Sequence, residues 1–147
     1  MLRVLLHTNQ LVNSLLSTQG PQARLVDAWR RRDFILCLAP KQLDEVSDVL
    51  ARPKIAKKYR TPSGERQAFL ELLRTNALLF PEAPAPGVCP DPDDDAILGC
   101  ASGGAVDYLV TEDGDLLEVA RYDGVRMVTE REFLTVLLSL DRRPLES

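Results

Sequence analysis

The sequence lacks the features of secreted, membrane-spanning and disulfide-bonded proteins. Its three cysteines are an odd number without a C-x-x-C pair, so no disulfide framework is predicted. The apolar run at residues 2–6 is too short for a signal peptide, and polar residues follow it at once. No stretch approaches the length that spans a bilayer. These absences predict a soluble, cytoplasmic protein with reduced thiols.

The chain also lacks a positive net charge and a glycine-rich phosphate loop. Its formal net charge is -4, which gives no global sign of nucleic-acid binding, although an acidic site and a separate basic patch can coexist. No G-x-G-x-x-G follows residues 2–6, which disfavours a nucleotide-binding Rossmann domain. His7, with no D-x-D at that position, disfavours a phosphatase that uses an aspartyl nucleophile.

What the sequence does have is an alternation of short apolar runs with amphipathic segments. This pattern predicts an α/β domain, with a mostly parallel sheet of about five strands and helices on both faces. We expect one domain over residues 1–140 and a loose tail over 141–147. Strands are predicted at residues 2–6, 34–38, 78–80, 108–110 and 125–128. Helices are predicted after residue 9, after residue 21, from residue 40, and over 62–77, 93–104, 113–120 and 129–140. The proline-rich residues 81–92 are predicted to be irregular.

Polar side chains gather where several of these elements begin or end. Residues 7–9 follow the first strand, residues 111–113 follow another, and acidic residues 91–95 begin a helix. Glu45 lies off the apolar face of the helix after the second strand. Because open parallel sheets bind ligands at the carboxyl ends of their strands, these groups can converge on one site. Crowded carboxylates favour a hard cation such as Mg²⁺ or Mn²⁺, which can activate water for phosphodiester hydrolysis.

Each feature also has an ordinary structural explanation. Asp93 to Asp95 at a helix start would complement the helix dipole, worth roughly 0.3–1 kcal/mol each. Residues 113–115 fit a tight turn. Glu45 alone would be a solvated surface charge, and a lone histidine at a strand end is more often structural than a ligand. A functional site is favoured only because all of these residues are expected at the same edge of the sheet.

The order HTNQLVNSLL, PKQLDEVSDVL with RPKI, DPDDDAILGCA and YLVTEDGDLL resembles the PIN domain over residues 3–138. Within that family the chain is most similar to toxin components of toxin–antitoxin systems. The resemblance implies a Mg²⁺- or Mn²⁺-dependent endoribonuclease that acts on RNA. It also implies a cognate antitoxin protein as partner and a homodimer as assembly.

The resemblance further implies a role for individual residues. The catalytic and metal-binding carboxylates are implied to be Glu45, Asp95 and Asp113, with Asp115 as a further ligand. Thr8, Asn9 and Thr111 are implied to support the site by hydrogen bonds.

His7 departs from the family's D-T-N motif, because it stands where the aspartate should be. The change removes a negative charge and an oxygen ligand. Imidazole is a poor ligand for Mg²⁺ but a reasonable one for Mn²⁺, Zn²⁺ or Ni²⁺. His7 therefore shifts the metal preference, impairs the enzyme, or is an introduced substitution that disarms it, and impaired activity is our expectation. The alternative is a non-catalytic PIN-fold module that binds RNA or a protein.

Two basic clusters could contact RNA, since phosphate neutralisation supplies most sequence-independent affinity. For Arg30 to Arg32, a solvated helix face explains the charges equally well. The second cluster is favoured for RNA because the resemblance places it beside the acidic groove, although an antitoxin peptide could cover the same surface. This second cluster comprises Arg52, Lys54, Lys57, Lys58 and Arg60.

Overall fold

The computed structural model of the chain describes residues 1–17, 19–59 and 63–141. The strands are β1 (Arg3–Leu6), β2 (Ile35–Leu38), β3 (Leu78–Leu79), β4 (Tyr108–Val110), β5 (Arg121–Tyr122) and β6 (Val125–Val128). The helices are α1 (Thr8–Leu16), α2 (Gly20–Arg30), α3 (Pro40–Ala51), α4 (Pro53–Tyr59), α5 (Ser63–Asn76), α6 (Pro92–Gly103), α7 (Gly114–Val119) and α8 (Glu130–Asp141).

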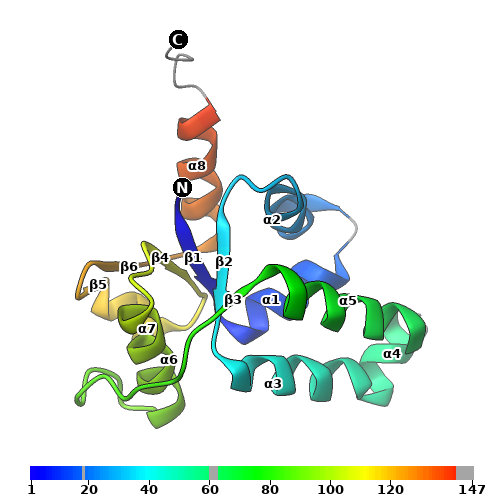
Figure 1. Cartoon of the computed structure of the whole chain (residues 1–147), viewed down its shortest axis with the longest axis horizontal. Helices are drawn as coiled ribbons and strands as arrows, with labels where there is room; N and C mark the ends of the chain where they lie inside the picture. The colour runs from blue at the N-terminus through cyan, green and yellow to red at the C-terminus, as the bar shows by residue number, and fades with distance from the viewer. Residues whose placement is uncertain (18, 60–62, 142–147) are drawn as a thin grey trace.

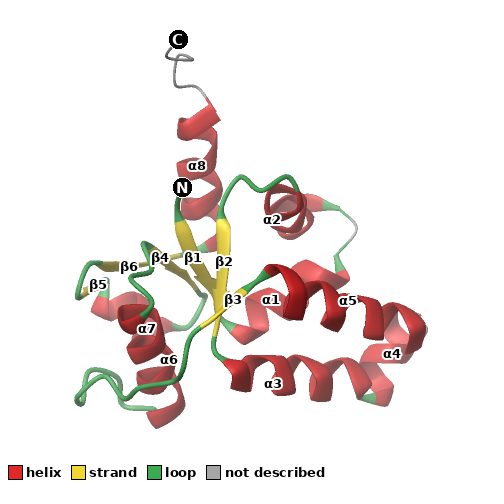
Figure 2. Ribbon diagram, in the orientation of Figure 1, coloured by secondary structure: helices red, strands yellow, loops and turns green. Residues whose placement is uncertain are grey.

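The strands form one six-stranded sheet in the order β3-β2-β1-β4-β6-β5 (Figures 1 and 2). Every neighbouring pair is parallel except β5 and β6, which are antiparallel. The predicted α/β fold with a mostly parallel sheet is therefore confirmed. Two elements were not predicted from the sequence: β5, which has only two residues, and α4, whose segment was noted only for its basic charges.

Two apolar cores lie on opposite faces of the sheet, because successive side chains of a strand point to opposite sides. Val4 and Leu6 of β1 pack into one cluster with residues of α1, α2, α3, α5 and α8. Leu5, between them, packs into the other cluster with residues of α6 and α7. All three side chains are at most 2% exposed, and full burial of such a side chain is worth about 1.5–3 kcal/mol. Helices thus cover both faces, as the sequence predicted.

The connectivity creates a crevice at the centre of the sheet. From β1 the chain runs to β2 and β3 on one side, and it then returns to β4 on the other side of β1. The ends of β1 and β4 are joined by the His7 N–H, which donates to the Val110 carbonyl at 2.9 Å. Ligands of open α/β sheets bind at the carboxyl ends of the strands where the strand order reverses. The fold therefore points to His7 and its neighbours.

The proline-rich segment between β3 and α6 is irregular, as predicted, and packs tightly on α6. A Cβ added to Gly99 would lie 1.3 Å from the Ala83 carbonyl oxygen, so only glycine admits this approach. Ala85 and Cys89 of the segment are buried in the second core. The segment is therefore part of the domain and fixes the start of α6 beside the sheet.

The structure bears on two of the absences noted in the sequence. The three cysteines are free and buried. Within the described residues, no helix combines the length and apolar character needed to cross a membrane.

Candidate active site at the carboxyl edge of the sheet

An open groove of about 400 Å³ lies at the carboxyl ends of β1 and β4, between α3 and α6. Of the residues expected at the site, it brings together His7, Thr8, Asn9, Glu45 and Asp113. Arg52, from the second basic cluster, also lines the groove. The remaining lining residues are Asp48, Val49, Asp91, Asp93, Asp94 and Ile97.

His7 lies at the centre of this groove with both ring nitrogens engaged. Its Nδ1 is 2.9 Å from the Thr111 hydroxyl oxygen, and its Nε2 is 3.2 Å from Asp94 Oδ1. The Thr111 hydroxyl oxygen also accepts the N–H of Asp113 at 2.9 Å. Thr111 is fully buried, so it holds the imidazole and the turn before α7 in fixed positions. His7 therefore links the end of β1 to the start of α6 through Asp94.

The start of α6 contributes Asp94 to the groove, where the sequence analysis expected Asp95. Asp95 does not line the groove, because its Oδ1 accepts the N–H groups of Val88 and Cys89, each at 3.0 Å. Consecutive helical residues point about 100° apart, so adjacent aspartates cannot face the same way. We therefore replace Asp95 by Asp94 in the candidate site and assign Asp95 to the folding of the proline-rich segment.

Glu45 is held in place by the side chains at the start of α1 and α3. The Thr8 hydroxyl donates to Glu45 Oε2 at 2.7 Å. Gln42 is fully buried, donates from Nε2 to the Leu6 carbonyl at 2.8 Å, and accepts the Ala39 N–H on Oε1 at 2.9 Å. Gln42 thus fastens α3 to the end of β1 and keeps Glu45 beside Thr8. The sequence analysis did not identify Gln42, although a glutamine at the third position of a helix is a known capping signal.

Asp113 and Asp115 have different roles. Asp113 lines the groove and also caps α7, since its Oδ1 accepts the N–H groups of Asp115 at 2.9 Å and Leu116 at 3.1 Å. Asp115 is exposed and does not line the groove. Of these two, the geometry supports only Asp113 as a groove carboxylate.

The groove is strongly acidic. Six carboxylates line it, and Arg52 is its only lysine or arginine side chain in the described part of the chain. Burial raises the pKa of Asp94 above its ordinary value, the nearby His7 opposes this rise, and Asp113 adds to it. Such a groove repels a phosphodiester unless a cation offsets the charge. The six carboxylates are Glu45, Asp48, Asp91, Asp93, Asp94 and Asp113.

The second basic cluster is only partly at this groove. Arg52 lies on its rim at the end of α3. Lys54 and Lys57 are exposed on α4 and do not line it. The side chain of Lys58 and the whole of Arg60 lie outside the described residues.

The family model of the PIN domain matches residues 3–115, which include β1, β4 and every residue lining the groove. The chain belongs to the PIN domain family. PIN domains are generally nucleases, so this match supports a hydrolase. No curated protein matches the chain. The acidic groove at the carboxyl edge of the sheet is thus the candidate active site of a PIN domain.

PIN nucleases usually use divalent metals, and the groove of this PIN domain does not fit one in the arrangement described. In the described ranges, no three His, Cys, Asp or Glu side chains are grouped closely enough to hold an ion. In this arrangement His7 Nε2 contacts Asp94 and His7 Nδ1 contacts Thr111. An ion bound to Asp94 would have to displace the imidazole from that carboxylate.

Glu130 and Glu112 form an acidic pair that does not line the groove of the PIN domain, and replacing Glu130 is predicted to give a pH-dependent gain in stability. The Glu130 side chain is buried, at 7% exposure, and its Oε2 has no hydrogen-bond partner in the described part of the chain. Burial raises the pKa of Glu130 above its ordinary 4.5, and the charge of Glu112 raises it further. Ionising Glu130 therefore destabilises the folded protein. This destabilisation is absent well below pH 4.5, where Glu130 is protonated in both states, and it is complete above the raised pKa. Glu130→Gln should stabilise the protein by about 1 kcal/mol at pH 7 and have little effect at pH 4.

Urea denaturation at both pH values measures this difference, and Glu132→Gln is the matched control. Glu132 is exposed, and hydrogen bonds from the Thr129 backbone and side chain lower its pKa. Its replacement should therefore reduce stability at pH 7. Equal effects of Glu130→Gln at the two pH values would show that its buried charge carries no penalty.

Proposed function

We propose that this chain is a toxin-type endoribonuclease of the PIN family whose activity His7 holds at a low level. The observation that carries the proposal is the convergence of Glu45, Asp94 and Asp113 around His7 at the reversal point of the sheet. Carboxylates gathered at that place are suited to phosphodiester hydrolysis. The imidazole engages Asp94 and stands where the family has a carboxylate, which is why activity is expected to be weak.

The residues of the groove have separate tasks in this proposal. Arg52 on the rim supplies the cationic contact for an RNA phosphate. Asp94, whose pKa is raised by burial, accepts a proton from the attacking water more readily than an ordinary aspartate. Thr8 fixes Glu45, and Thr111 fixes both His7 and the turn that carries Asp113. Mg²⁺ or Mn²⁺ remains the proposed cofactor, and we expect the groove to bind it weakly because His7 engages Asp94.

The proposed biological context is a toxin–antitoxin system in the cytoplasm. RNA is the proposed substrate, a cognate antitoxin protein is the proposed inhibitor, and the proposed assembly is a homodimer. The six carboxylates of the groove favour an antitoxin segment with basic side chains, because opposite charges attract across an interface.

Cleavage of labelled single-stranded and structured RNA by the unmodified protein tests the proposal. We expect slow cleavage in Mn²⁺ that is lost in EDTA and in the Asp94→Asn variant. Cleavage that persists in EDTA or in Asp94→Asn would come from elsewhere and would contradict the proposal.

A second candidate function is a non-catalytic module that binds RNA or a protein. The contact between His7 and Asp94 favours it, since this contact occupies a carboxylate that the nuclease needs. This candidate predicts that the protein cuts no RNA even when His7 is replaced by aspartate.

A further inference from the structure

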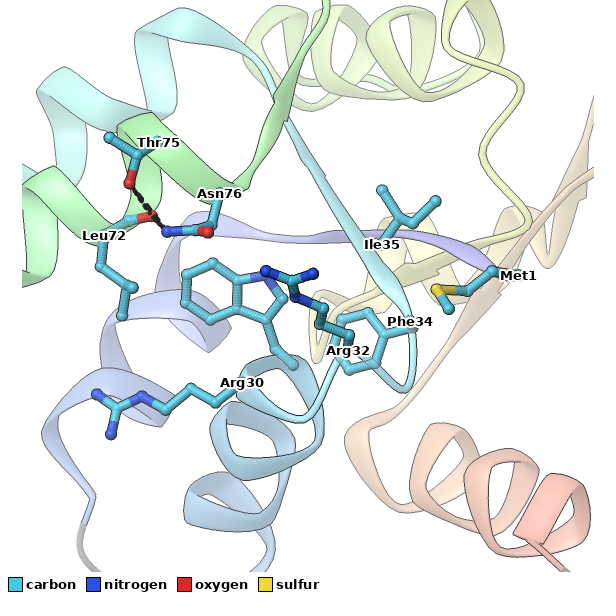
Figure 3. A pocket seen from close by; sticks show the side chains of 9 residues that line it. Met1, Arg30, Arg32, Phe34, Ile35, Leu72, Thr75 and Asn76 are labelled. Carbon is cyan, nitrogen blue, oxygen red and sulfur yellow. Dashed lines mark hydrogen bonds between the residues drawn. The ribbon is translucent and has the colours of Figure 1, made fainter.

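A second depression of about 400 Å³ lies at the opposite edge of the sheet from the acidic groove, where α2, α5 and the start of β2 meet (Figure 3). Its floor is apolar and includes Trp29 and Phe34, which are 7% and 2% exposed. Arg30 and Arg32 are exposed side chains that line the same cavity (Figure 3). Ile35, Leu72, Thr75, Asn76 and Met1 complete the lining.

The polar groups of this cavity are mainly hydrogen-bond donors. In the described part of the chain, no carboxylate lines the cavity and neither Arg30 nor Arg32 forms an ion pair. The neighbouring Arg31, in contrast, pairs with Asp33 at 3.0 Å and lies outside the cavity. The cavity thus presents two unpaired positive charges above an apolar floor.

The backbone of Arg32 is strained in a way that positions its side chain. Helix α2 ends in a turn in which Arg32 N–H donates to the Trp29 carbonyl and Asp33 N–H donates to the Ala28 carbonyl, each at 2.9 Å. The residue at this place has a left-handed backbone and is usually glycine. Arg32 adopts φ 63° there. Strained backbone of this kind clusters at functional sites, and Arg32 is one of the residues that line this cavity.

We propose that this cavity binds a nucleotide, with its phosphate between Arg30 and Arg32 and its base on the apolar floor at Trp29. Two guanidinium groups balance the two negative charges of a phosphate monoester. A ligand with a single carboxylate would leave one of the two guanidinium groups unpaired. The indole N–H of Trp29 can donate to a nitrogen or oxygen acceptor of a nucleobase. The volume of the cavity is in the range of small-molecule sites. The ligand is either a free nucleoside monophosphate or the phosphorylated end of an RNA strand. The inference is independent of the nuclease proposal.

Trp29 is the only tryptophan of the chain, so its fluorescence reports on this cavity directly. Titration with AMP should change the fluorescence saturably, while adenosine and inorganic phosphate should each bind at least about tenfold more weakly than AMP. RNA hexanucleotides with a 5′-phosphate or a 5′-hydroxyl provide the second arm. Binding of AMP identifies a free nucleotide as the ligand, and binding of the phosphorylated RNA alone identifies the end of a strand.

Arg32→Gly is the decisive variant because it removes the guanidinium and relieves the strained backbone. It should weaken binding by about tenfold or more while leaving the melting temperature unchanged or higher. Arg24→Gln, an equal charge change at an exposed site of α2 outside this cavity, should bind like the parent. Arg30→Gln provides a second rim variant with the same expected loss. The proposal is overturned if neither AMP nor phosphorylated RNA gives a saturable change, if inorganic phosphate binds as tightly as AMP, or if Arg32→Gly binds like the parent.

Discussion

Replacing His7 by aspartate is expected to create a tight divalent metal site, where the unmodified protein binds the ion only weakly. The substitution releases Asp94 from the imidazole, 3.2 Å away, and adds a carboxylate next to it. Mn²⁺ at about 100 times its dissociation constant would stabilise the folded variant by about 2.7 kcal/mol. For a domain of this size that corresponds to a rise in melting temperature of about 5–10 °C. The unmodified protein should show no comparable shift.

Thermal unfolding with Mn²⁺, with Mg²⁺ and in EDTA measures this effect, and His7→Asn is the matched control. Asparagine also removes the imidazole but adds no negative charge. His7→Asn therefore shows the effect of freeing Asp94 alone, whereas His7→Asp also adds a carboxylate ligand. We expect the largest shift for His7→Asp and a smaller one for His7→Asn. A shift of several degrees in the unmodified protein would show that the His7 site already binds the ion tightly, which contradicts the role given to His7.

The two adjacent aspartates at the start of α6 are expected to respond in opposite ways to alanine. Asp95→Ala should cost about 3 kcal/mol or more of folding stability, because the N–H groups of Val88 and Cys89 lose a charged acceptor and that of Cys89 is buried. Asp94→Ala should leave stability unchanged or raise it, since burial raises the pKa of Asp94 and its ionised form carries a desolvation penalty.

Urea denaturation of both variants at pH 7 tests this division of roles. The circular dichroism of Asp94→Ala should match that of the parent, so that any loss of function in this variant is chemical. A large loss of stability in Asp94→Ala, together with none in Asp95→Ala, would reverse the assignment of the two residues.

The fold was readable from the sequence because its signals are local. The strands at Arg3–Leu6 and Ile35–Leu38 are continuous apolar runs between polar residues, which is the pattern of a strand buried on both faces. β5 was missed because two residues carry no periodicity. α4 was missed because its basic composition hides a short helix that begins at a proline, a residue tolerated in the first turn.

The site was only partly readable, because its contacts join residues far apart in the chain. The sequence showed that acidic residues open α6, but the choice between Asp94 and Asp95 depends on the helix phase relative to β1. That phase is set by the packing of the proline-rich segment on Gly99 and by its hydrogen bonds to Asp95. No local pattern reports such contacts. The contact of His7 with Asp94 is likewise a property of the tertiary structure.

The measurement that tests the central claim most directly is the rate of RNA cleavage in Mn²⁺ by His7→Asp, with and without Asp94→Asn. We predict that His7→Asp cuts RNA about 100-fold faster than the unmodified protein, as expected when a missing metal ligand is supplied. Adding Asp94→Asn should abolish this cleavage. Cleavage by His7→Asp that stays at the unmodified level, or that survives Asp94→Asn, would contradict the account.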